Sequence, residues 1–115
     1  MTAPDFVADF FQRMEGEPWF SGLPVGPFTV DSMGNNMLEY AVLDNNLEVV
    51  RYLIEVGVDV NGKGEFGYTP LITAMESEEY ETACYLLCMG GDGNVKNVDG
   101  LSAFDILRIK LFGNC

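Results

Sequence analysis

The chain alternates short apolar stretches at helical spacing with polar or glycine-rich breaks. Leu38, Ala41 and Val42 form one short apolar face. The pair Asn45-Asn46 interrupts it, and a second apolar face follows before Gly57. Apolar positions three and four residues apart are typical of amphipathic helices, and glycine suits the left-handed residue that ends many helices. The pattern therefore predicts two short antiparallel helices joined by a turn.

The same unit recurs along the chain at one constant interval. Gly34, Gly67 and Gly100 are equally spaced along the sequence. The same spacing relates Leu38 to Leu71 and Phe104, Leu53 to Leu86, Gly57 to Gly90, Asp59 to Asp92, and Asn61 to Asn94. A fixed period of about 33 residues is the signature of a repeat architecture. Because neither helix pair can bury its apolar side alone, the predicted units must stack on one another.

Two stretches of the repeat resemble a known family. The second unit contains Gly67-Tyr-Thr-Pro-Leu71 followed by Ala74, which is similar to the G-x-T-P-L-H-x-A-A line of ankyrin repeats. The first unit ends in Gly57-Val-Asp-Val-Asn61, which is similar to the family's G-A-D-V-N line. The resemblance covers roughly residues 31–111, the larger part of the chain. It implies an all-α fold, an ankyrin-repeat α-solenoid of helix-turn-helix repeats connected by hairpin loops.

The repeats depart from the family pattern at several positions. Asn36-Met37 and Ser102-Ala103 replace Thr-Pro in the first and third repeats. The positions of the family's usual histidine hold Glu39, Ile72 and Asp105, and Gly93 stands where a β-branched residue is usual. In the family the Thr-Pro-Leu-His stretch ties one repeat to the next through hydrogen bonds. We therefore expect a looser hydrogen-bond network between these repeats.

The predicted organisation is one folded domain in two parts. Residues 1–30 form an N-terminal capping helix and loop, and residues 31–115 form the repeats, divided as 31–63, 64–96 and a truncated 97–115. Residues 4–15 read as an amphipathic helix that Thr2-x-x-Asp5 could cap and Gly16 stops. Its apolar face comprises Phe6, Val7, Phe10, Phe11 and Met14. We expect that face to cover the open end of the first repeat; the alternative is that it docks a partner or a second copy.

Two apolar segments lie outside the full repeats. Residues 16–28 are rich in proline and glycine, which predicts an irregular loop, yet the loop carries Trp19, Phe20 and Phe28 and is too apolar for a free linker. At the other end, residues 104–112 predict a helix with apolar positions almost all round. The preceding repeat, the N-terminal segment or another molecule must cover it. A homodimer through either end is therefore left open.

Charge narrows the classes of function. Eighteen acidic residues against six basic ones give a net charge of −12, and histidine is absent. A strongly negative protein is a poor non-specific ligand for nucleic acid or for an anionic membrane surface. The absence of histidine excludes a His-dependent triad. The charge is densest at residues 64–96, which carry −5, and such a field favours association with a basic protein partner.

The cysteines give information about the cellular compartment and do not indicate a metal site. Cys84, Cys88 and Cys115 make an odd count, and the N-terminus lacks the basic and apolar pattern of a secretory signal, so we expect reduced thiols and a cytoplasmic protein. No apolar run approaches the roughly 20 residues that span a bilayer. Cys84 and Cys88 align with surface positions of the first repeat. No further ligands complete a tetrahedral metal site, so we expect no metal and no cofactor.

Other clusters of polar residues are weak candidates for chemistry. Residues 92–100 superficially suggest a calcium loop, but Lys96 occupies a ligand position and Ala103 stands where a closing glutamate is needed. We interpret this stretch as a connecting hairpin. The acids Glu76, Glu78, Glu79 and Glu81 are interpreted as a solvated edge. The sequence thus predicts no active site and a protein that is not an enzyme.

The resemblance implies that partners dock on the hairpin tips and on the exposed side of the first helix of each repeat. Large apolar groups with an acidic rim are typical of protein docking surfaces. The alternative is that Phe66 and Tyr68 only pack between adjacent hairpins. The candidate partner-binding residues are Met33, Asn35, Leu43, Asp44, Glu65, Phe66, Tyr68, Glu76, Ser77, Val98, Asp99 and Leu101, with Ser32 beside them.

These observations predict a protein-protein interaction module. A small acidic domain with no second module has little to scaffold, so we expect a stoichiometric inhibitor, such as an immunity protein that neutralises a basic toxin or enzyme. This role rests on analogy with small ankyrin proteins found beside toxic effectors in bacteria. The alternative is a general adaptor or regulatory subunit without an inhibitory role.

Overall fold

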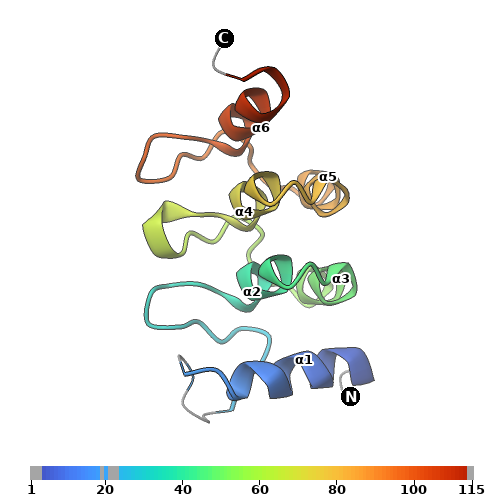
Figure 1. Cartoon of the computed structure of the whole chain (residues 1–115). Helices are drawn as coiled ribbons and strands as arrows, with labels where there is room; N and C mark the ends of the chain where they lie inside the picture. Colours follow the sequence, from blue (N-terminus) through green and yellow to red (C-terminus); the bar gives the residue numbers. More distant parts are fainter. Residues whose placement is uncertain (1–3, 19, 21–23, 114–115) are drawn as a thin grey trace.

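The protein is an elongated stack of helices, as Figure 1 shows from N- to C-terminus. The computed structural model describes residues 4–18, 20 and 24–113, with extents of 48 × 25 × 19 Å. The elements are α1 (Asp5–Glu15), α2 (Met37–Leu43), α3 (Leu47–Glu55), the 3-10 turn η1 (Glu65–Gly67), α4 (Pro70–Glu76), α5 (Tyr80–Cys88) and α6 (Ala103–Phe112). The predicted all-α solenoid is confirmed.

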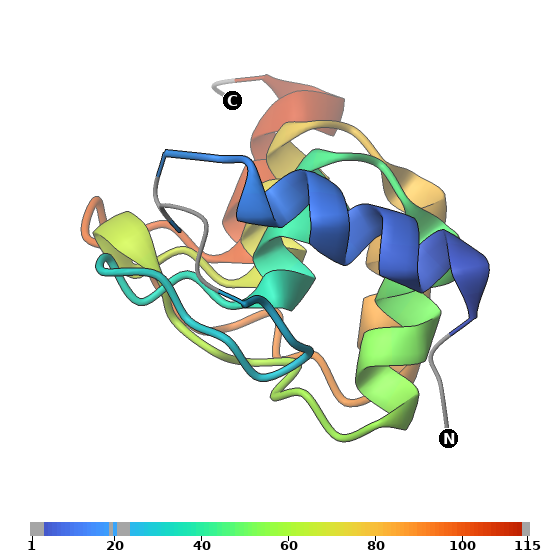
Figure 2. The same ribbon diagram turned by 90° about the horizontal axis from the view of Figure 1, so that it is seen from below.

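Beyond α1, the described α-helices form two full antiparallel pairs and one single helix of a third unit. Helix α2 packs on α3, and α4 packs on α5. The first helices α2, α4 and α6 contact one another in that order along the stack. The loops that precede them gather along one side of the stack (Figures 1 and 2). Within the described ranges these loops contribute isolated β-bridges, Val30 with Asn36 and Lys96 with Ser102, rather than strands.

The first helices begin alike despite their different sequences. Asn36, Thr69 and Ser102 are the N-cap residues of α2, α4 and α6, at equivalent positions of the three repeats. Each side-chain oxygen accepts a hydrogen bond from the backbone amide three residues later, at 3.0, 3.2 and 3.1 Å. Asparagine, threonine and serine are all good N-caps. The replacements of Thr-Pro therefore preserve the helix starts.

Glycine ends the second helix of each pair as predicted. Gly57 follows α3 with φ of +103°, and Gly90 follows α5 with φ of +98°. Residues with a β-carbon rarely adopt this left-handed conformation. The repeated glycines thus direct the chain out of each second helix and back toward the loops.

The N-terminal helix closes one end of the stack. Val7, Phe10 and Met14 are buried in the same core as the repeats, and α1 contacts α3. The capping role is therefore confirmed. Phe6 is 41% exposed, so the predicted apolar face is wider than the face that packs. The helix begins at Asp5 with Pro4 at the N-cap position, and the expected cap Thr2 lies outside the described residues.

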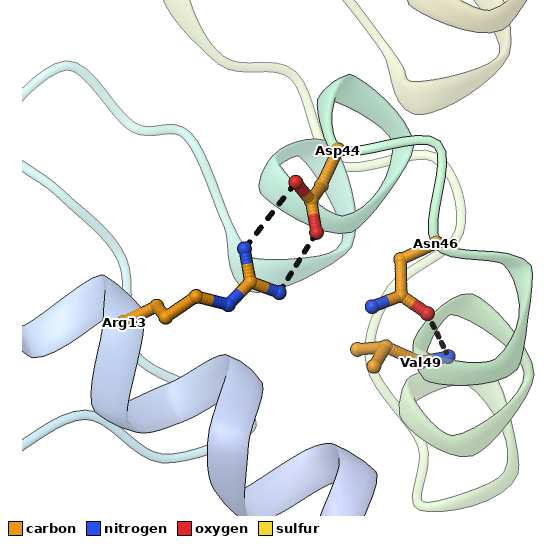
Figure 3. Close-up of polar contacts among 4 residues, drawn as sticks. All are labelled: Arg13, Asp44, Asn46 and Val49. Carbon is orange, nitrogen blue, oxygen red and sulfur yellow. Dashed lines mark hydrogen bonds and ion pairs between the residues drawn. The ribbon is translucent and has the colours of Figure 1, made fainter.

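An ion pair joins the N-terminal helix to the first repeat. Arg13 of α1 donates to both carboxylate oxygens of Asp44, at 3.4 and 2.9 Å (Figure 3). Asp44 is the C-cap residue of α2. Nearby, the side chain of Asn46 caps α3 by accepting from the amide of Val49 at 3.3 Å. The two contacts tie α1 and α3 to the turn between the paired helices.

The proline-rich loop after α1 is partly core. Phe20 and Val25 are 5% and 8% exposed. Phe28 is 62% exposed, so it contributes little to this anchoring. Trp19 lies outside the described residues. This loop is therefore anchored at its middle and open at its end.

The C-terminal helix is covered on one side only. Ala103 and Ile106 of α6 are buried where the helix packs on α4. Leu107 packs partly against the core, whereas Phe104, Ile109, Leu111 and Phe112 are between 38% and 66% exposed. The preceding repeat thus covers part of this helix, and its outer side is open within the described part of the chain.

The unusual Gly93 makes room for an aromatic ring of α6. A β-carbon at Gly93 would lie 2.4 Å from ring atoms of Phe104. The backbone amide of Phe104 also donates to the Gly93 carbonyl at 3.2 Å. The departure from a β-branched residue at this position therefore accompanies the close approach of the Phe104 ring.

Direct hydrogen bonds do link the first two repeats. The hydroxyl of Thr73 in α4 donates to a carboxyl oxygen of Glu39 in α2. The side-chain oxygen of Asn35 also accepts from the backbone amide of Glu65 in the second repeat at 2.9 Å. The expected loosening is thus not seen at this junction, because glutamate takes a linking role at the position where histidine is usual in the family.

Candidate functional site

An open groove of about 730 Å³ lies between the loops and first helices of the first two repeats. The first repeat contributes its loop and α2, and the second repeat contributes η1 and α4. The groove is lined by Asp31, Ser32, Met33, Asn35, Glu39, Tyr40, Leu43, Glu65, Phe66, Tyr68, Thr73, Glu76 and Ser77. This surface is called the inter-repeat groove below.

The structure brings eight of the twelve predicted residues together in the inter-repeat groove. These are Met33, Asn35, Leu43, Glu65, Phe66, Tyr68, Glu76 and Ser77. Of the other four, Asp44 pairs with Arg13. Val98 and Asp99 are exposed on the third loop, and Leu101 is half-buried beyond it. The predicted patch therefore divides into a groove between two repeats and a third loop that lies outside the groove lining.

The apolar part of the groove is exposed. Met33, Leu43 and Phe66 are 56%, 59% and 63% exposed. Tyr68 is half-buried, and its hydroxyl donates to Glu76 at 2.8 Å. That hydrogen bond, together with burial, raises the pKa of Tyr68 to about 12. The Phe66 side chain is thus available to a partner rather than hidden between hairpins.

The backbone of Phe66 is strained. Its φ of +57° and ψ of +21° lie in the left-handed region, which costs a residue with a β-carbon about 1 kcal/mol. The Phe66 carbonyl accepts a hydrogen bond from the Val98 amide of the third loop at 2.9 Å, which helps to hold this conformation. Strained residues that the surroundings maintain are concentrated at functional sites. The strain presents an aromatic ring to solvent at the edge of the groove.

Asn35 lines the groove but acts as a structural residue. Its backbone amide and side-chain amide donate to the two carboxylate oxygens of Asp31, at 2.9 and 3.1 Å. Its side-chain oxygen accepts from the Glu65 amide of the next loop at 2.9 Å. Asn35 therefore sets the spacing of the two loops that form the groove walls.

Four carboxyl groups line the groove, and the lining contains no lysine or arginine within the described residues. They belong to Asp31, Glu39, Glu65 and Glu76. Asp31 also accepts a hydrogen bond from the Tyr40 hydroxyl. Burial raises the pKa of Asp31, but the hydrogen bonds from Tyr40 and Asn35 outweigh it and leave this pKa below its usual value. Asp31 is therefore a carboxylate at neutral pH.

Glu39 differs from the other three acids because it is buried. Its side chain is 7% exposed, and burial raises its pKa to about 7 even though the hydrogen bond from Thr73 acts in the opposite direction. Thr73 donates to Oε1. The second oxygen, Oε2, has no hydrogen-bond donor among the described residues. A buried polar atom without a partner is costly, so this oxygen marks a place where a donor could bind.

The sequence reasoning missed four residues of the groove: Asp31, Glu39, Tyr40 and Thr73. One signal was present for Glu39. It is an ionisable residue among the apolar positions of α2, at the place of the family's usual histidine. The pairing of Tyr40 with Asp31, nine residues apart, gave no recognisable pattern in the sequence.

Two of the three cysteines lie on the surface. Cys84 and Cys88 are exposed, whereas Cys115 lies outside the described residues. In the described ranges no cluster of three or more acidic or cysteine side chains could hold a metal ion.

Glu79 is half-buried, with a pKa raised by burial, so the predicted acidic edge at residues 76–81 is not fully solvated. Among the described helices, none has the length and apolarity required to cross a membrane.

Comparison with known families identifies the repeat. A family model described as ankyrin repeats (three copies) matches residues 18–97. The match includes both full helix pairs and the groove between them. It begins within the proline-rich loop and ends in the third hairpin loop.

Curated relatives share the repeats but are longer. The chain is 35% identical over 79 residues to protein phosphatase 1 regulatory subunit 27 of Homo sapiens, covering 69% of this chain and 51% of that protein. It is 44% identical over 73 residues to the BTB/POZ domain and ankyrin repeat-containing protein NBCL of Lotus japonicus, covering 62% of this chain and 15% of that protein. The chain thus spans about half the length of the regulatory subunit it matches.

Proposed function

The chain belongs to the ankyrin-repeat family, and from that premise we propose that it is a non-catalytic subunit that holds a basic protein partner in the inter-repeat groove. Protein-protein interaction is the general role that the repeats indicate. The proposal adds the place and the charge of the partner. A regulatory subunit is the favoured form of this role.

The observation that carries the proposal is Phe66. This aromatic side chain is 63% exposed although its backbone is strained. A folded chain gains little stability from such a residue, because the ring buries little area and the conformation costs free energy. Exposed aromatic groups next to a concave surface are the usual anchors of protein interfaces. Phe66, Met33 and Leu43 form such an anchor at the groove.

Two further observations support a regulatory role. One of the relatives is named as a regulatory subunit of protein phosphatase 1, and it is 35% identical to this chain over 79 aligned residues. The net charge of −12 and the four acids of the groove favour a basic surface on the partner. Charge complementarity of this kind speeds association and weakens as salt rises.

The test is affinity capture from the native cell with matched variants. Tagged wild-type chain is compared with Met33→Ala/Phe66→Ala, and the captured proteins are identified by mass spectrometry. The control is Phe28→Ala, because Phe28 is 62% exposed but lies outside the groove. We expect a basic protein at one-to-one stoichiometry that the groove variant loses and the control retains. Equal capture by both variants would place binding elsewhere and reject the proposal.

A second candidate is a stoichiometric inhibitor, including an immunity protein that neutralises a basic toxin or enzyme. The strong negative charge of a small domain supports it. The same captured partner separates the two roles. An inhibitor abolishes the partner's activity at equimolar concentration with a dissociation constant in the nanomolar range or tighter. A regulatory subunit leaves the partner active and changes the rate of the partner's reaction or the substrate that the partner selects.

A further inference from the structure

The floor of the inter-repeat groove contains an unpartnered acid. Glu39 is more than nine-tenths buried, with 7% of its surface exposed, and it lies in the groove lining with Thr73 and Tyr40. Thr73 occupies one carboxyl oxygen, and Oε2 has no donor within the described part of the chain. Oε2 is itself covered in the free protein, so a donor that enters through the groove satisfies it as the Glu39 carboxyl group turns toward the opening.

Of the other three acids of the groove, Asp31 and Glu76 already have donors, and Glu65 is only half-buried, so water can reach it. Asp31 accepts from Tyr40 and from the amide groups of Asn35. Glu76 accepts from the Tyr68 hydroxyl at 2.8 Å. Glu39 is therefore the acid for which an incoming donor brings the largest gain, because most of its desolvation has already taken place in the free protein.

The walls above Glu39 suit a side chain that is apolar along its length and cationic at its end. Met33, Leu43 and Phe66 supply exposed apolar surface, and the acids supply negative charge without a lysine or arginine in the described lining. Long basic side chains pack their methylene groups on apolar surface and keep the charged end on polar groups. An anionic or purely apolar side chain leaves Oε2 without a donor.

We propose that the inter-repeat groove is a receptor for one arginine side chain of the partner, whose guanidinium group donates to Glu39 Oε2. The inference rests on the proposed function and adds the recognised residue. Arginine fits better than lysine because its planar group presents several donors in a fixed fork, so it can reach Glu39 and a neighbouring acid together. The aromatic ring of Phe66 is placed to contact the stem or the guanidinium face.

The experiment uses two capped peptides, Gly-Arg-Gly-Arg-Gly and the same peptide with citrulline in place of arginine. Citrulline keeps the shape of arginine and removes its charge. Binding is followed by NMR with carboxyl-labelled glutamate. We expect the arginine peptide to bind at least about tenfold more tightly than the citrulline peptide. A cation on Glu39 favours the ionised form, so the pKa of Glu39 falls on binding.

Two variants with the same change in net charge test the contact itself. Glu39→Gln keeps an oxygen for Thr73 but removes the charge, whereas Glu48→Gln removes a charge from the exposed face of α3. We expect Glu39→Gln to weaken binding of the arginine peptide by about tenfold and Glu48→Gln by less than about twofold. Amide spectra of both variants check that each remains folded.

Several outcomes overturn the inference. These are equal losses in the two variants, equal binding of the two peptides, an unchanged pKa of Glu39, or no binding of the arginine peptide. The affinity-capture experiment distinguishes a failure of the arginine contact from a failure of the proposed partner-binding role. If Glu39→Gln retains the natural partner and Met33→Ala/Phe66→Ala loses it, the groove binds a partner without an arginine contact at Glu39.

Discussion

The hydroxyl of Thr73 donates a hydrogen bond to the carboxyl group of Glu39, which lies 34 residues earlier in the chain. The contact joins the first helices of two adjacent repeats. It also holds an ionisable group inside the stack, where burial raises its pKa to about 7. One pair of residues therefore links the repeats and makes their stability sensitive to pH.

The first prediction concerns that pH dependence. The folded chain binds a proton at Glu39 more tightly than the unfolded chain does, because its pKa rises from 4.5 to about 7 on folding. The corresponding stabilisation is fully present below about pH 4.5 and is lost as the pH rises through about 7. We expect Glu39 to contribute a fall of about 3 kcal/mol in the free energy of unfolding across this interval. Glu39→Gln removes that fall, as urea unfolding at a series of pH values measures.

The matched control is Glu55→Gln, since Glu55 is an exposed acid on α3. Its pH profile should follow that of the wild-type chain. Asp31 acts in the opposite direction under acidic conditions, because its lowered pKa adds stability that is lost as the pH falls. The comparison is therefore made above about pH 5, where Asp31 is ionised in both states. Parallel profiles for wild type and Glu39→Gln would contradict the prediction.

The second prediction is that neighbouring substitutions in η1 have opposite effects. Phe66→Gly relieves a left-handed φ of +57° at an exposed residue, so the free energy of unfolding should rise by up to about 1 kcal/mol. Gly67→Ala puts a β-carbon at a residue with a φ of +74°, 3.2 Å from the Asn97 Cα. The free energy of unfolding of this variant should therefore fall by at least about 1 kcal/mol. Thermal unfolding of the two variants provides the measurement. A loss of stability in Phe66→Gly would show that the ring is a packing residue.

The third prediction ranks the contacts of the N-terminal helix. Arg13 and Asp44 form an exposed ion pair at 2.9 Å, with 53% and 36% of their side-chain surfaces accessible. Such pairs contribute about 1 kcal/mol or less and are screened by salt. Phe10 is fully buried, and its truncation to alanine should cost about 3 kcal/mol or more. Urea unfolding of Asp44→Ala and Phe10→Ala at low and at high salt measures the loss in the free energy of unfolding. Only the loss in Asp44→Ala should become smaller as the salt concentration rises.

The fourth prediction is an energetic coupling between Gly93 and Phe104. Gly93→Val places a side chain where the Phe104 ring now lies, 2.4 Å from the new β-carbon. Overlap of this kind is destabilising unless the ring moves. We expect Gly93→Val to lose stability in the wild-type background and to lose less in a Phe104→Ala background. A double-mutant cycle measures the difference, and additive effects would mean that the ring moves aside freely.

Much of the fold could be predicted because its determinants are local. The constant repeat period, the helix pairs and the glycines that end α3 and α5 follow from residue type and spacing. A cap needs only a side chain and an amide three residues later, which is why Asn36 and Ser102 act as Thr69 does. The amphipathic pattern likewise identified Val7, Phe10 and Met14 as residues that close the stack.

The sequence by itself therefore determined the helices, their order and the loops that carry the candidate surface. Only the tertiary structure decided how polar groups distant in the chain pair with one another. It joined Asp44 to Arg13, 31 residues apart, and buried Glu39 against Thr73 in the next repeat. The reason is physical: helix formation depends on neighbours along the chain, whereas burial and pairing of a charge depend on which segments stacking brings into contact.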